Sequence, residues 1–163
     1  MKFEDLLKKD HFTKDEIIRL LDCNEQERKL LFAESARIKE KYIGNKVYFR
    51  GLVEFSNICA KSCYYCGIRA GNSKTVRYQV TEDEVLEAAK YAFDEGYGSM
   101  VIQAGERSDK KFVDQITNLL IRIKEMSSGK LGITLSLGEQ SEETLRTWFN
   151  AGAHRYLIRI EAS

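Results

Sequence analysis

Hydrophobic and polar positions show two different periodic patterns along the chain. Near the N-terminus the apolar residues recur at helical spacing, and Thr13 with Glu16 forms a Thr-x-x-Glu capping box that starts a helix. A second helix is predicted from about residue 25 to residue 41, ending near Gly44. Residues 1–45 are therefore predicted to form a helical leader ahead of the rest of the chain.

From residue 47 onward, short runs rich in β-branched, aromatic and other apolar residues alternate with segments of helical periodicity. Strands are predicted at 47–55, 99–104, 132–137 and 156–160, with helices between them that begin at Thr81, 111 and Ser141. Such an alternation implies parallel strands joined by right-handed crossovers, in either a doubly wound sheet or a β/α barrel. A complete eight-unit barrel needs roughly 200–250 residues. We therefore expect an α/β fold at residues 46–163, a truncated TIM-type barrel of about the first four βα units.

The strand pattern also predicts which side chains face the barrel interior. Residues two apart share a face of a strand, so Gln103, Thr134 and Ser136 face inward if their apolar neighbours pack against the helices. Polar side chains inside a barrel indicate an occupied, wet cavity, or alternatively a solvated interior layer. The apolar strand residues expected to be packed are Val101, Ile102, Ile133, Leu135, Leu157 and Ile158.

Charge and composition exclude several classes of function. Lysine and arginine number 26 against 25 acidic residues, so the net charge of +1 does not favour a nucleic-acid partner. The apolar runs are too short for a membrane span. The opening residues MKFEDLLKKD lack the apolar core of a signal peptide, so a cytoplasmic protein is expected. In that compartment, four cysteines indicate metal binding or catalysis rather than disulfides.

Three of the cysteines form a C-x3-C-x2-C pattern: Cys59, Cys63 and Cys66. Three thiolates can bind three irons of a 4Fe–4S cubane, which leaves the fourth iron open to a small chelating molecule. A zinc site with three cysteines and one histidine is the alternative, but His11 and His154 both lie far from the pattern in sequence. The remaining Cys23 lies on a predicted apolar helical face and is expected to be an inert core thiol.

The cysteine loop follows a first strand and has an aromatic residue, Tyr65, directly before its last cysteine, which resembles the radical S-adenosylmethionine (SAM) superfamily. Longer stretches resemble the HydE branch of that superfamily, the FeFe-hydrogenase maturases, and in weaker form biotin synthase and methylornithine synthase. These stretches are VEFSNIC (53–59), YYCGIR (64–69), VIQAGE (101–106), TLSLGE (134–139) and RYLIRIE (155–161). The resemblance implies a β/α-barrel enzyme that uses a 4Fe–4S cluster to cleave SAM to a 5′-deoxyadenosyl radical during assembly of the hydrogenase H-cluster.

The resemblance also implies roles for single residues. The Gly105-Glu106 turn would offer backbone carbonyls to the methionine amino group of SAM, although an ordinary β-to-α turn is the alternative. Glu161 would accept hydrogen bonds from the ribose hydroxyls, unless it forms a structural ion pair with Arg159. The implied cofactor-binding set is Tyr65, Gly105, Glu106, Ser136, Arg159 and Glu161, and the residues assigned to the substrate cavity are Gln103 and Thr134 with Arg159.

The implied partners follow from the same resemblance. The substrate would be a small molecule or an organometallic iron species supplied by a partner maturase, and ferredoxin or flavodoxin would donate the electron. No nucleic acid and no membrane are expected. Three alternatives stay open: another radical SAM synthase, acting on a free amino acid or dethiobiotin; a non-catalytic iron–sulfur or zinc-binding module; and a chain that is inactive by itself because it lacks the second half of the expected barrel.

Overall fold

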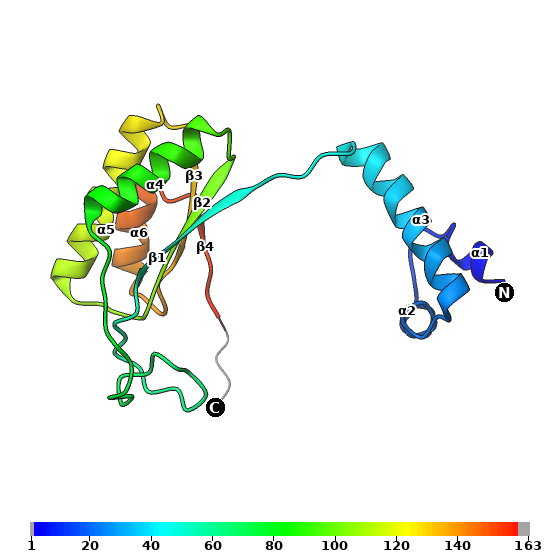
Figure 1. Cartoon of the computed structure of the whole chain (residues 1–163), viewed down its shortest axis with the longest axis horizontal. Coiled ribbons are helices and arrows are strands. Elements are labelled where there is room, and N and C mark those ends of the chain that lie inside the picture. The colour runs from blue at the N-terminus through cyan, green and yellow to red at the C-terminus, as the bar shows by residue number, and fades with distance from the viewer. Residues whose placement is uncertain (1, 160–163) are drawn as a thin grey trace. The chain divides into compact units, whose positions relative to one another are not determined.

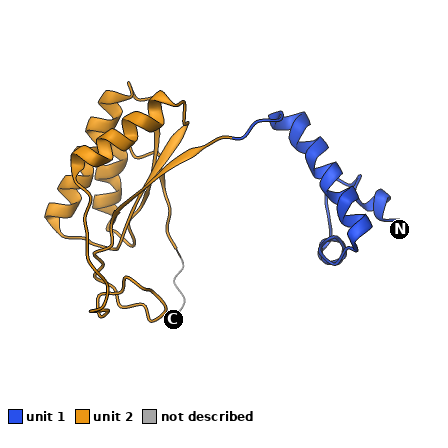
Figure 2. Ribbon diagram, in the orientation of Figure 1, with its two compact units in different colours: residues 1–47 blue, residues 48–163 orange. Residues whose placement is uncertain are grey.

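The computed structural model describes residues 2–159 and divides into two compact units, residues 1–47 and 48–163 (Figure 2). The first unit holds three helices, α1 (Phe3–Leu6), α2 (Lys14–Leu21) and α3 (Glu25–Ile43). The predicted capping box is confirmed, because Thr13 accepts a hydrogen bond from the Glu16 amide and the Glu16 carboxylate accepts one from the Thr13 amide. Gly44 follows α3 with a φ of 75°, which ends the helix where the sequence predicts.

The second unit alternates strands and helices along the chain. Its elements are β1 (Arg50–Ser56), α4 (Glu82–Asp94), β2 (Ser99–Ala104), α5 (Lys110–Met126), β3 (Gly132–Ser136), α6 (Glu142–Asn150) and β4 (Arg155–Tyr156). The strands form one parallel sheet in the order β1-β2-β3-β4. Figure 1 shows α4, α5 and α6 on the same side of this sheet. Sequential strand order with helices on one face is the arrangement of a β/α barrel, whereas a doubly wound sheet reverses its strand order partway.

The core of this unit lies between the sheet and its three helices. Ile102, Ile133 and Leu135 are fully buried there, as the strand pattern predicts, together with Phe55 and Trp148. Burying each large apolar side chain contributes roughly 1.5–3 kcal/mol. This layer therefore holds the strands in register beneath the loops that follow them.

Three of the sequence expectations for the strands are wrong. Val101 is only partly buried, because it pairs with Leu52 and Thr134 on the sheet face opposite Ile102. Leu157 and Ile158 are 43% and 58% exposed and follow β4 rather than packing within it. A strand is predicted at 156–160, of which residue 160 lies outside the described residues. The described strand β4 comprises Arg155–Tyr156, because its ladder with β3 ends at the pair Leu135–Tyr156.

The carboxyl ends of β1, β2 and β3 carry the loops of interest. The long loop after β1 spans residues 57–81 and contains all three cysteines of the C-x3-C-x2-C pattern. Shorter loops follow β2 and β3 at the same end of the sheet, the rim at which β/α barrels build their sites. Among the helices in residues 2–159, none has the length and apolar composition needed to cross a bilayer.

Candidate functional site

The cysteine loop, residues 57–72, begins directly at the end of β1, and the chain that follows the loop returns along the same strand. Cys59, Cys63 and Cys66 are partly buried free thiols within it. The returning chain is held by Asn57, whose side-chain amide donates to the Val76 carbonyl at 2.8 Å and whose side-chain carbonyl accepts from the Tyr78 amide at 2.8 Å. An irregular loop needs such partners, because backbone groups outside a ladder must still be hydrogen-bonded when buried.

Gly105, at the end of β2, lies against the start of the cysteine loop. Its amide donates to the Ser56 carbonyl at 3.0 Å, and the Ala60 amide donates to the Glu106 carbonyl at 2.8 Å. A Cβ atom at position 105 would lie 2.4 Å from the Ile58 carbonyl oxygen and 2.7 Å from the Cys59 Cβ. Glycine is therefore required here by the cysteine loop itself. The Glu106 carbonyl keeps a second lone pair, which leaves it free for the ligand contact that the resemblance implies.

The Glu106 carboxylate joins the cysteine loop to the loop after β3. Its Oε1 lies 3.2 Å from Lys61 Nζ, and its Oε2 accepts a hydrogen bond from the Glu139 amide at 3.0 Å. Lys61 also contacts the Glu139 carboxylate at 3.2 Å, and these two acidic partners, Glu106 foremost, raise the pKa of the lysine. Gly138 allows the close approach, because it has a φ of 78° and a Cβ there would lie 2.4 Å from Glu106 Cγ.

Tyr156 supports the same loop from β4. Its hydroxyl donates to the Gly138 carbonyl at 2.8 Å, and its ring stacks on Trp148 in the core. Burial raises the pKa of Tyr156 to about 12, and the nearby Glu106 charge acts in the same direction. The phenol therefore stays protonated and keeps its hydrogen bond across the physiological pH range.

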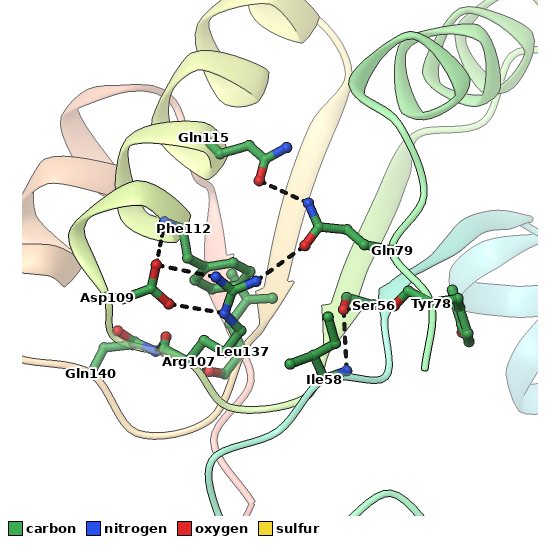
Figure 3. A network of polar contacts seen from close by, with 10 residues as sticks. All are labelled: Ser56, Ile58, Tyr78, Gln79, Arg107, Asp109, Phe112, Gln115, Leu137 and Gln140. Carbon is green, nitrogen blue, oxygen red and sulfur yellow. Dashed lines mark hydrogen bonds and ion pairs between the residues drawn. The ribbon is translucent and has the colours of Figure 1, made fainter. Parts of the chain in front are cut away.

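A second polar network, drawn in Figure 3, fixes the returning chain to α5. The Arg107 guanidinium lies over the Phe112 ring, pairs with Asp109 at 2.9 Å and donates to the Gln79 side chain at 3.1 Å. Gln79 in turn donates to Gln115 at 3.0 Å. The loops after β1 and β2 are thus joined on both flanks of the site.

These loops enclose a cavity of about 520 Å³. Nine of the eleven residues predicted for the site line it: Cys59, Cys63, Tyr65, Cys66, Gln103, Gly105, Glu106, Ser136 and Arg159. Thr134 does not line it, because it lies two residues before Ser136 on β3, deeper below the rim, and is 6% exposed. Glu161 lies outside the described residues. The neighbouring Tyr64 is 95% exposed, so it does not cover the cavity.

The cavity floor is a row of polar side chains across three strands. Glu54 pairs in register with Gln103, and Gln103 pairs with Ser136. Arg159 reaches this row by donating from Nη2 to the Gln103 side-chain oxygen at 3.1 Å. Its expected alternative partner, Glu161, is beyond the described part of the chain. The row is complementary to a ligand that carries both hydrogen-bonding and charged groups.

Sequence reasoning did not identify three further residues of the site: Glu54, Asn57 and Lys61. Glu54 had a readable signal, because it stands between Val53 and Phe55, which pack into the core, and so lies on the opposite face of the strand. Asn57 and Lys61 belong to an irregular loop, where no periodicity indicates the direction of a side chain. Their contacts depend on segments that are distant in sequence.

The donor set at the rim fits an iron–sulfur cluster. A cubane binds each of three cysteines through a different iron, which matches the three free thiols on one loop. His154 lies near Gly132 at the start of β3, the opposite end of the sheet from the cysteines. The expectation for Cys23 was wrong in one respect. Cys23 is partly buried, but it lies in the turn between α2 and α3 rather than on a helix.

Comparison with known proteins identifies the family to which a chain with this site belongs. The sequence profile of the radical SAM superfamily matches residues 53–163. The chain is 37% identical over 159 residues to the [FeFe] hydrogenase maturase subunit HydE of Thermotoga maritima, covering 96% of this chain and 44% of that protein. It is 28% identical to biotin synthase of Staphylococcus epidermidis, covering 97% of this chain and 51% of that protein.

Solved structures agree on the fold. The crystal structure of methylornithine synthase (PylB) superposes with a TM-score of 0.79 at 22% identity, covering 96% of this chain and 47% of that one. The chain thus spans about half the length of the relatives it matches. Enzymes of this superfamily use a 4Fe–4S cluster together with SAM, which agrees with the three thiols at the rim. On the profile match and the cysteine loop together, the chain belongs to the radical SAM superfamily.

Proposed function

We propose that Cys59, Cys63 and Cys66 bind a 4Fe–4S cluster and that the cavity beside them holds SAM for reductive cleavage. The observation that carries this proposal is that the cysteine loop and the Gly105-Glu106 turn meet at one cavity, joined by the bond from the Ala60 amide to the Glu106 carbonyl. When bound, a reduced cluster would supply one electron to the sulfonium of SAM, and cleavage of the C–S bond would give methionine and a 5′-deoxyadenosyl radical.

The residues of the chain contribute binding, orientation and exclusion of water. The Glu106 backbone carbonyl, which accepts one bond from the Ala60 amide, keeps a second lone pair for a ligand, and the Glu106 carboxylate fixes the loop after β3. The row of Glu54, Gln103 and Ser136, with Arg159 above it, provides hydrogen bonds to the substrate. Placing reactive groups in a fixed cavity reduces the entropic part of the barrier and keeps solvent away from a reactive intermediate.

The test is anaerobic reconstitution of the chain with iron and sulfide. We expect a brown protein with about four irons per chain. The substitutions Cys59→Ala, Cys63→Ala and Cys66→Ala should each abolish it, while Cys23→Ala, the matched control, should behave like the wild type. A colourless protein with stoichiometric zinc would overturn the proposal and support the zinc-binding module instead.

The finer proposal is that the substrate belongs to FeFe-hydrogenase maturation. It is supported by the 37% identity to a protein named as a hydrogenase maturase subunit, against 28% for biotin synthase. An organometallic iron substrate, a partner maturase that supplies it and a ferredoxin or flavodoxin electron donor are parts of this proposal, as is a cytoplasmic location.

Complementation distinguishes the two branches. In a strain that lacks its own HydE, a chimera in which this chain replaces the matching part of the Thermotoga maritima HydE should restore FeFe-hydrogenase activity, and its Cys63→Ala variant should not. If only the corresponding chimera with biotin synthase is active, restoring growth of a biotin synthase-deficient strain without biotin, the chain would be assigned to the biotin synthase-like branch.

A further inference from the structure

Arg77 lies on the returning chain five residues after the cysteine loop ends, and its guanidinium turns back into that loop. Nη1 donates to the Asn57 carbonyl at 2.7 Å and to the Ile68 carbonyl at 2.8 Å. Nη2 donates to the Arg69 carbonyl at 2.7 Å and to the Asn72 carbonyl at 3.3 Å. Each terminal nitrogen of a guanidinium carries two hydrogens, so these four bonds use all four terminal N–H donors.

The four carbonyls lie on both sides of the cysteines. Asn57 is two residues before Cys59, and Ile68 is two residues after Cys66. The guanidinium therefore joins the incoming and outgoing limbs of the loop at its neck. The backbone of Arg77 is fixed in turn by Asn57, whose side chain bonds to the residues on either side of it, Val76 and Tyr78.

The charge pattern separates this arginine from an ordinary ion pair. No aspartate or glutamate stands between Glu54 and Glu82 in the sequence, and within residues 2–159 the partners of Arg77 are backbone oxygens only. Hydrogen bonds from a charged donor are about twice as strong as neutral ones, and a planar fork directs them in fixed directions. A lysine has a single nitrogen and cannot span both limbs in this way.

We propose that Arg77 is a positioning residue, which holds the neck of the cysteine loop closed and thereby sets the places of the three thiols before any cluster is bound. The inference that Arg77 places the thiols for a cluster rests on the proposed function. The inference that Arg77 holds the loop neck closed does not, because it concerns the chain without iron. Arg77 acts through the loop backbone and is not assigned a contact with the cluster or SAM.

The loop itself is tested by hydrogen–deuterium exchange of the iron-free chain. Two amides report on the loop: Ala70, which donates to the Lys61 carbonyl at 2.8 Å, and Cys66, which donates to the Cys63 carbonyl at 3.0 Å. In Arg77→Gln their exchange should quicken about tenfold or more, while the amides of β2 keep their wild-type rates. In Arg77→Lys the exchange rates of these two loop amides should lie between those of the wild type and those of Arg77→Gln. Arg146→Gln is the control, because it removes an arginine whose ion pair with Glu142 lies on α6.

Unchanged loop exchange in Arg77→Gln would overturn the proposal, as would an increase spread equally over the loop and β2. If Arg77→Gln does not fold, the comparison of Arg77→Lys with Arg146→Gln decides in the same way. The second measurement is the rate at which a chelator removes iron from the reconstituted chain. The rate of iron removal should rise about tenfold in Arg77→Gln. If amide exchange in the loop quickens but iron is removed at the wild-type rate, the role of Arg77 toward the cluster is refuted. Failure of the wild-type chain to bind iron would refute the proposed function, with the exchange result still deciding the loop.

Discussion

Replacing Gly105 with alanine tests how closely β2 and the cysteine loop are fitted. The added Cβ would lie 2.4 Å from the Ile58 carbonyl oxygen, 2.8 Å from the Ile58 carbonyl carbon and 2.7 Å from the Cys59 Cβ. Ordinary contact begins at 3.4 Å, so the backbone next to Cys59 must move by about 1 Å. A rearrangement of this kind in a packed region costs about 1–3 kcal/mol.

The Ile58 carbonyl and Cys59 cannot easily move away from an added Cβ at position 105. The carbonyl belongs to backbone that the Gly105 amide itself holds, through its bond to Ser56 at 3.0 Å. The displacement therefore falls on the first cysteine of the loop. We expect Gly105→Ala to lower the free energy of unfolding of the iron-free chain by about 1–3 kcal/mol and to reduce iron incorporation in reconstitution.

Gly67→Ala is the matched control, because Gly67 directly follows Cys66 in the same loop and a Cβ there meets nothing within 4 Å. It should bind iron as the wild type does. Urea unfolding and iron analysis of the two variants side by side make the comparison. Wild-type stability and iron content in Gly105→Ala would show that the close contact does not constrain the loop.

Two further predictions concern the loop after β3. Gly138→Ala should destabilise the chain by about 1–3 kcal/mol in urea unfolding, and by less when Glu106→Gly removes the clashing Cβ, Cγ and Oε2 atoms; equal costs in both backgrounds would contradict the contact. In the wild type, the stability due to the protonated Tyr156 is fully present below its ordinary pKa of 10.0 and is lost as pH rises toward about 12. Tyr156→Phe should lack this fall, and identical pH profiles of the two proteins would refute it.

Much of the fold is encoded in local patterns. The capping box of Thr81 and Glu84 begins α4 as predicted, and the strand expected at 99–104 matches β2. These features depend on residues a few positions apart, which periodicity and capping chemistry detect. Predictions at the last strand were less accurate, because the extent of β4 depends on its ladder with β3.

The residues of the site likewise divide into those that a local sequence pattern predicts and those that depend on contacts between distant segments. The three cysteines carry their chemistry in their own spacing, and Gly105-Glu106 lies at the predicted rim. The contacts of Arg77 and Lys61 could not be predicted, since each joins an irregular loop to segments with no fixed sequence distance. Gly105 was expected to accommodate a ligand, and the structure adds a steric reason within the chain. The roles of Glu161, Thr134 and the other predicted ligand contacts stay predictions.

Electron paramagnetic resonance of the reconstituted, dithionite-reduced chain, with and without SAM, tests the central claim most directly. Three cysteine ligands leave one iron without a protein ligand, so SAM can chelate that iron through its amino and carboxylate groups. The account predicts the signal of a reduced 4Fe–4S cluster that changes when SAM is added. The signal should be absent from Cys59→Ala and present in Cys23→Ala. A cluster signal that SAM leaves unchanged, or no cluster signal in the wild type, would contradict it.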